Sequence, residues 1–145
     1  MKRHLVRDLM TGMVPSVRPG DTLARLFDLM ETRHVRHVAV VDRPRGLVGL
    51  VAHGDLMRHA VAIMEDMSLA PRRDHLETMK VAEIMTTAVL TIEPERDAFE
   101  AAELMVERGI GCLPVVEGEV LIGLLTESDF VRWEAGQAHP AAAQR

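Results

Sequence analysis

Hydrophobic and polar positions change period in the same order twice along this chain. Each copy opens with an extended apolar segment, residues 14–17 or 89–92, which ends at Pro19 or Pro94. Apolar residues at three- and four-residue spacing then predict a helix with one buried face, and they are Leu23, Leu26, Phe27 and Met30, or Ala98, Ala101, Ala102 and Met105. Asp21 and Glu95 suit the N-terminal dipoles of these helices.

Two short apolar segments follow in each copy, residues 38–41 and 47–51 or 113–116 and 120–125. A charged turn joins each pair, which predicts a hairpin. A second helix begins near Gly54 or Ser128. The predicted order is therefore β-α-β-β-α, twice, in an α/β (α+β) fold.

The two copies are an internal duplication. One constant offset places Val6, Met10, Thr11, Leu29, Met30 and Val40 on Val81, Met85, Thr86, Leu104, Met105 and Val115. Past the hairpin turn, an offset shorter by one residue places Gly49, Asp55 and Arg58 on Gly123, Asp129 and Arg132. Neither copy is long enough to bury much surface alone, so we expect a shared core.

The duplication predicts the domain boundaries. Residues 1–62 form the first repeat, 63–80 a connector, 81–136 the second repeat, and 137–145 a disordered tail with few bulky apolar residues. Ala60, Val61, Met64 and Met67 continue the helix into the connector until residues 71–74 break it.

Composition and charge exclude several classes of function. The chain has 145 residues, 48% of them hydrophobic, and a net charge of −5 without a basic stripe, so nucleic acid is not expected as a partner. Apolar runs are too short to span a bilayer, and residues 1–8 lack a secretory h-region. We therefore expect a cytoplasmic protein without a membrane partner, in which Cys112 is a buried, inert thiol.

Catalytic and metal-binding patterns are missing from the sequence. Ser68 and Ser128 have no evident histidine and acid partners. The histidines most open to a metal role, His34, His37, His53, His59 and His75, read as surface residues, because a zinc site needs three or four converging ligands. We expect no enzymatic activity and no required cofactor.

Three motifs that recur in order identify a family resemblance. They are Asp8-Leu9-Met10-Thr11 and Glu83-Ile84-Met85-Thr86, then residues 38–42 and 113–117, and finally Gly123-Leu124-Leu125-Thr126-Glu127-Ser128-Asp129. The chain thus resembles a tandem pair of cystathionine-β-synthase (CBS) domains, a stand-alone Bateman-type module. The resemblance implies two repeats packed as a pseudo-twofold pair, with AMP, ADP, ATP or S-adenosylmethionine bound in the cleft between them. It also implies a homodimer.

The resemblance assigns roles to the motif Gly123, Thr126 and Asp129. Asp129 would accept hydrogen bonds from ribose hydroxyls, and Thr126 would contact ribose or phosphate at the start of a helix. The alternative is that Asp129 only satisfies backbone donors at the helix N-terminus. Asp55 repeats the carboxylate, but Ala52 replaces the hydroxyl, so that site is expected to be weaker.

Other candidate residues have two readings. Arg36 and His37 begin a central strand and would reach nucleotide phosphates, or they belong to a solvated charge cluster at 33–37. Further residues would line the cleft beside a nucleobase, or are ordinary strand residues, and these are Val14, Ser16, Leu90 and Thr91.

Two functions therefore compete. The first is a non-catalytic regulatory module that binds an adenosine-type ligand and signals to an unknown effector protein by conformational change. The second is a ligand-free scaffold for dimerisation. Its adaptable apolar surface would comprise Met57, Met64, Met67 and Met79, unless these residues belong to the core. The Thr126 and Asp129 pair favours the first.

Overall fold

The computed structural model describes residues 3–43, 46–66 and 72–136, and the side chains of 63–66 and 72–74 are outside the description. The chain forms two compact units. Unit 1 comprises Met1–Val14 and Leu90–Arg145, and unit 2 comprises Pro15–Val89. These units do not follow the sequence copies, because the first residues of each copy pack in the unit that holds most of the other copy.

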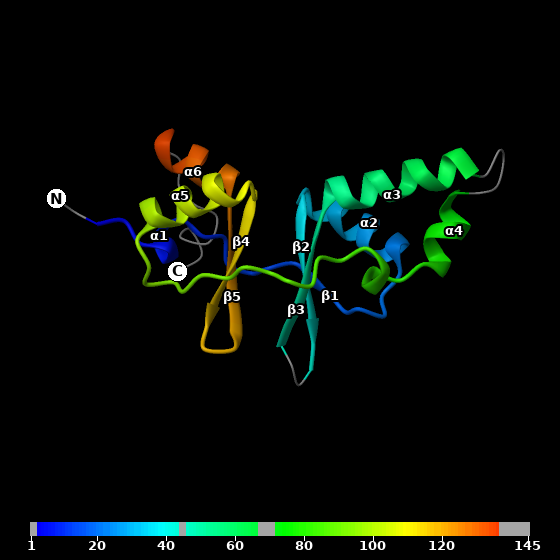
Figure 1. The fold of residues 1–145 in the computed structure, drawn as a ribbon, viewed down its shortest axis with the longest axis horizontal. Coiled ribbons are helices and arrows are strands. Elements are labelled where there is room, and N and C mark those ends of the chain that lie inside the picture. The colour runs from blue at the N-terminus through cyan, green and yellow to red at the C-terminus, as the bar shows by residue number, and fades with distance from the viewer. Residues whose placement is uncertain (1–2, 44–45, 67–71, 137–145) are drawn as a thin grey trace. The chain divides into compact units, whose positions relative to one another are not determined.

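Unit 2 is built on a three-stranded sheet with strand order β1-β2-β3. β1 (Ser16–Val17) pairs in parallel with β2 (His37–Asp42), which pairs antiparallel with β3 (Gly46–Ala52). The helices are α2 (Leu23–Arg33), α3 (His53–Asp66) and α4 (Arg72–Thr78), and a 3₁₀ turn, η1, spans Val81–Glu83. Figure 1 shows α2 and α3 beside the β2–β3 hairpin.

Unit 1 repeats this plan around the hairpin of β4 (Cys112–Glu117) and β5 (Val120–Thr126). Its helices are α1 (Val6–Leu9), α5 (Ala98–Arg108) and α6 (Glu127–Glu134). The extended segment predicted at 89–92 forms one parallel bridge, Ile92 to Val115, rather than a strand. The mixed α/β class with two repeats is confirmed, while the packing of the two repeats on one another stays a prediction.

The long helices α2 and α5 are capped by residues that follow Asp21 and Glu95 in the sequence. Thr22 Oγ1 accepts a hydrogen bond from Arg25 N at 3.1 Å, and Asp97 accepts from Phe99 N at 2.7 Å. Thr22 and Asp97 are thus the N-caps of α2 and α5. Asp21 serves the preceding turn, where it accepts from Arg18 N at 2.8 Å.

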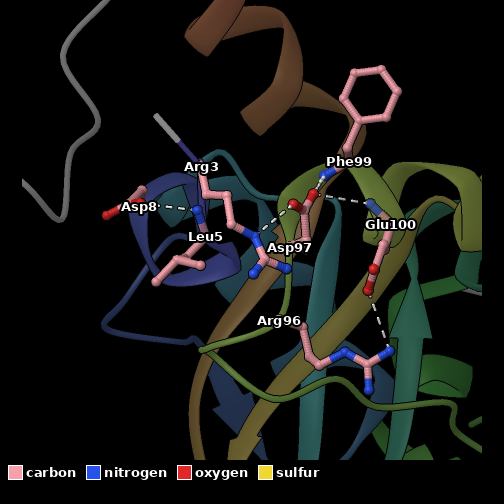
Figure 2. A network of polar contacts seen from close by, with 7 residues as sticks. All are labelled: Arg3, Leu5, Asp8, Arg96, Asp97, Phe99 and Glu100. Carbon is pink, nitrogen blue, oxygen red and sulfur yellow. Dashed lines mark hydrogen bonds and ion pairs between the residues drawn. The ribbon is translucent and has the colours of Figure 1, made fainter. Parts of the chain in front are cut away.

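Hydrogen bonds and an ion pair join the N-terminal segment to the residues at the start of α5 (Figure 2). Arg3 Nε donates to Asp97 at 3.3 Å, and Leu5 N donates to Asp8 at 2.9 Å. Val6 N also donates to Arg96 O at 2.8 Å. Unit 2 repeats this with residues from the second copy, since Lys80 N donates to Glu83 and Val81 N to Asp21 O.

Each unit has its own core cluster, and each cluster mixes the two sequence copies. In unit 1, Val6, Leu9 and Met10 of the first copy pack with α5, β4 and β5 of the second. In unit 2, Val81 of the second copy packs with Leu26 and its neighbours in the first. The predicted helix faces are buried at Leu23, Leu26, Met30, Ala98, Ala101 and Met105, with Phe27 and Ala102 partly buried.

The connector holds more helix than the sequence predicted. α3 continues to Asp66 as expected, and α4 follows where only a helix break was predicted. Of the methionines in the scaffold hypothesis, Met57 is 41% exposed, and Met79 packs against the unit 2 core. The side chains of Met64 and Met67 lie outside the described residues, as does the predicted tail at 137–145.

Candidate functional site

The repeated methionine–threonine motif forms an extra backbone pair beside each hairpin. In unit 1, Thr11 N donates to Leu124 O and Leu124 N donates to Thr11 O, both at 2.9 Å. Gly123 permits this approach, because a Cβ there would lie 2.7 Å from Met10 Sδ and 3.0 Å from Thr11 O. Close packing against Met10 and Thr11 therefore explains the glycine of the predicted ligand motif without reference to a ligand.

Unit 2 repeats the same arrangement with the second copy's motif. Thr86 and Leu50 exchange backbone hydrogen bonds of 2.9 and 3.0 Å. A Cβ on Gly49 would lie 2.8 Å from Met85 Sδ. In each unit, the extra backbone pair beside the hairpin is thus made by a threonine from the other sequence copy.

The β5–α6 junction holds Thr126 and Asp129 together. Asp129 is buried, and its Oδ2 accepts from Thr126 N at 2.8 Å and from Thr126 Oγ1 at 3.3 Å. Its Oδ1 accepts from Thr11 Oγ1 at 2.9 Å and from the Arg132 guanidinium. The carboxylate therefore caps α6, as in the alternative reading, and also contacts side chains from two other positions.

The β3–α3 junction carries Asp55 in a more open environment. Asp55 accepts from Ala52 N at 3.1 Å and from the Arg58 guanidinium. Its side chain is 26% exposed, whereas that of Asp129 is 0% exposed. Ala52 offers no hydroxyl, as the sequence indicated.

Arg36 and His37 lie at the same junction as Asp55. His37 is paired in register with Ala52, and Arg36 O accepts from His53 N at 2.7 Å. The Arg36 side chain is exposed and that of His37 half-buried. These basic residues are therefore placed near the N-terminus of α3, where an anion is favoured.

The remaining candidates divide between the units. Ser16 is exposed on β1 in unit 2. Val14 and Thr91 are half-buried and Leu90 is 37% exposed, all in unit 1. Together with Thr126 and Asp129 they belong to one unit, while Ser16, Arg36, His37 and Asp55 belong to the other.

Sequence reasoning missed Thr11 and Arg132 as neighbours of Asp129. The signal was present in the duplication, because Thr11 aligns with Thr86, and Arg132 aligns with Arg58. Both arginines contact an aspartate one helical turn earlier. Asp129 differs from Asp55 in its deeper burial and in accepting from the hydroxyls of Thr11 and Thr126.

Other chemistry is limited in the part of the chain that the structure describes. Burial, with a smaller effect of Asp129, raises the pKa of the Cys112 thiol to about 12. No group of three potential metal ligands gathers among residues 3–43, 46–66 and 72–136. None of the helices in those ranges is long and apolar enough to cross a bilayer.

Comparison with known proteins decides the family. The CBS domain model matches residues 6–62 and 81–136, which are the two sequence copies. The chain belongs to the CBS domain family. It is a tandem CBS pair, as the repeated motifs indicated.

Similar CBS proteins include solved structures and enzymes. AcuB from Vibrio cholerae is 31% identical, with a TM-score of 0.81 over 94% of this chain and 95% of that one. CBSX2, solved in complex with AMP, is 26% identical, with a TM-score of 0.74 over 92% and 97%. Inosine-5'-monophosphate dehydrogenase of Methanocaldococcus jannaschii is 30% identical over 97% of this chain and 24% of its own length.

The chain spans 24–36% of the length of the first curated relatives that it matches. The matched region is thus one part of those longer proteins, some of which are named as enzymes.

Proposed function

We propose that this CBS pair is a regulatory module that binds an adenosine nucleotide, with Asp129 and Asp55 as acceptors for the ribose hydroxyls. The observation that carries the proposal is the duplicated aspartate at the start of α6 and α3, each held by its own strand–helix junction. A carboxylate can accept from two neighbouring hydroxyls at once. The AMP complex of the similar protein CBSX2 supports this ligand class.

Each junction supplies a different part of a nucleotide site. Thr126 adds a hydroxyl at the N-terminus of α6, where the helix dipole favours phosphate. The other junction lacks that hydroxyl but has Arg36 and His37 as phosphate partners and the more accessible carboxylate, Asp55. We propose unequal affinities at the two junctions, with Val14, Ser16, Leu90 and Thr91 near the base. The position of the ligand relative to the other repeat stays a prediction.

The regulatory role completes the proposal. The module is non-catalytic and needs no cofactor, acts in the cytoplasm as a homodimer, and signals to an effector protein. Ligand binding would shift the populations of two conformations in proportion to its different affinity for each. AMP, ADP, ATP and S-adenosylmethionine all carry the ribose diol that the aspartates would bind.

Thermal shift against AMP, ADP, ATP, NAD and S-adenosylmethionine tests the proposal, because a ligand that binds only the folded chain raises the unfolding midpoint. We expect a rise with at least one adenosine compound. The rise should shrink in Asp129→Asn and Asp55→Asn, which keep the size of the side chain but lose its charge. No rise with any compound at millimolar concentration would refute nucleotide binding.

A dimerisation scaffold is the second candidate, and exposed apolar residues on unit 1 favour it. Phe99 and Val106 on α5 are 76% and 83% exposed, and Val131 on α6 is 69% exposed. These residues replace the methionines as the stronger apolar surface among the described side chains. Light scattering of wild type and of a Phe99→Ser, Val106→Ser variant would test it, since a scaffold requires a dimer that the variant loses.

A further inference from the structure

The carboxylate of Asp129 is already engaged without a ligand. Thr126 contributes two donors to Oδ2, its backbone N at 2.8 Å and Oγ1 at 3.3 Å. Thr11 Oγ1 and the Arg132 guanidinium donate to Oδ1. A carboxylate has about four lone-pair sites, so these donors fill them. The side chain is also 0% exposed, and a ribose cannot simply add to it.

A ribose diol can therefore reach Asp129 only if it replaces donors that are present. The Thr126 backbone donor is fixed by the first turn of α6, and losing it would cost the helix its cap. The two donors on Oδ1 are side-chain groups with rotatable bonds, and the Arg132 side chain is 32% exposed. A ribose hydroxyl can therefore replace a donor at Oδ1 without breaking the backbone hydrogen bond that caps α6.

We infer that the Thr11 hydroxyl competes with the ribose for Asp129 Oδ1, so that Thr11 lowers nucleotide affinity and connects the site to the N-terminal segment. This inference rests on the proposed nucleotide function. It is independent of where unit 2 lies, because Thr11, Thr126, Asp129 and Arg132 all belong to unit 1.

Thr11 lies just before the point at which the chain passes from unit 1 to unit 2. Its backbone is paired with Leu124, and Met13 follows with a left-handed φ of 49° and 68% exposure. A methionine in that conformation is strained. The chain then leaves unit 1 at Val14 and enters unit 2 at Pro15. The Thr11–Asp129 bond thus lies close in sequence to the segment that joins the two units.

The duplication supplies a matched control. Thr86 occupies the same position in unit 2, with the same backbone pairing to Leu50. Thr86 is exposed, and the nearby Asp55 accepts from Ala52 N and Arg58. Thr86→Val therefore makes the same chemical change in the same local backbone, but in unit 2, whereas Asp129 belongs to unit 1.

The test is calorimetric titration of AMP into full chains that carry Asp55→Asn, so that the Asp129 site dominates the signal. Thr11→Val removes the competing hydroxyl at nearly constant volume, and AMP should bind about ten-fold tighter. Thr11→Ser and Thr86→Val should leave the affinity unchanged. Unchanged or weaker binding in Thr11→Val would overturn the inference, because a hydroxyl that only supports Asp129 would weaken binding when removed.

Two further readouts separate this inference from the proposed function. Without nucleotide, Thr11→Val should lower the unfolding midpoint relative to Thr11→Ser, so that stability and affinity move in opposite directions. In the Asp55→Asn chain with Thr11 intact, AMP should shift the Thr11 methyl resonance and leave that of Thr86 in place. If AMP binds but the Thr11 resonance does not move, the inference is wrong and the proposed AMP site still stands. If the wild type binds no AMP, both the inference and the proposed AMP site are wrong.

Discussion

Gly123→Ala should destabilise the chain because the methionine–threonine segment lies directly against this glycine. The added Cβ would be 2.7 Å from Met10 Sδ, 3.2 Å from Met10 Cγ and 3.0 Å from Thr11 O. The methionine side chain can move, but Thr11 O belongs to a backbone pair with Leu124 and cannot move freely. Overpacking of this kind costs about 1–3 kcal/mol.

The reduced freedom of the unfolded chain offsets part of that cost, since Gly→Ala alone stabilises by about 0.4–1 kcal/mol. We therefore expect Gly123→Ala to lower the free energy of unfolding by about 1–2 kcal/mol in urea titrations followed by circular dichroism. Gly20→Ala is the control, because nothing lies within 4 Å of its added Cβ. It should be neutral or slightly stabilising.

Met10→Ala separates the clash from other effects of the substitution. In that background the Sδ and Cγ contacts are absent, so Gly123→Ala should cost less than in the wild type, with a coupling energy of about 1 kcal/mol. Additive effects in the double variant, or a Gly123→Ala chain as stable as Gly20→Ala, would refute the close approach of Met10 and Gly123.

Three other outcomes are expected. The backbone hydrogen bond from Phe99, with the Arg3 contact, lowers the pKa of Asp97, so Asp97→Ala should lower the unfolding midpoint at neutral pH. This difference should shrink as the pH falls below the unfolded value of about 3.9 and through the lower folded pKa, and a constant difference from pH 7 to pH 2 would contradict it. Cys112, with its pKa raised to about 12, should resist a thiol-specific disulfide reagent at pH 8 until guanidinium unfolds the chain, and rapid labelling of the folded protein would contradict its burial. Leu26→Ala should cost about 2–5 kcal/mol because its side chain is 0% exposed, while Phe99→Ala at a 76% exposed position should cost far less, and equal costs would contradict the assigned core.

Local pattern was sufficient for the two longer helices and the hairpin of each copy, but not for α1 or η1. The three- and four-residue spacing at Leu23, Leu26 and Met30 identified the buried face of α2, because burial along one helix depends on nearby residues. The N-caps, Thr22 and Asp97, could not be selected from the sequence, since several polar residues precede each helix and only the backbone geometry distinguishes among them.

The exchange of N-terminal segments between units could not be predicted in the same way. Periodicity says that Val6 and Met10 are apolar, but it does not say which hairpin they pack against. The same limit applies to Asp129. Its place at the start of a predicted helix offered the capping contact as the alternative to ribose binding, whereas the Thr11 contact joins residues far apart in sequence and depends on the tertiary fold. The repeated motif did show that Thr11 and Thr86 hold equivalent positions.

The proposed function requires that an aspartate carboxylate accept the ribose diol of an adenosine nucleotide. Calorimetric titration of the wild type with AMP and with 2′-deoxy-AMP tests this claim, because the two ligands differ in one hydroxyl. We predict saturable AMP binding and at least about ten-fold weaker binding of the deoxy analogue, from the loss of one hydrogen bond to a charged acceptor. Equal affinity for the two ligands, or no binding of either, would contradict the claim.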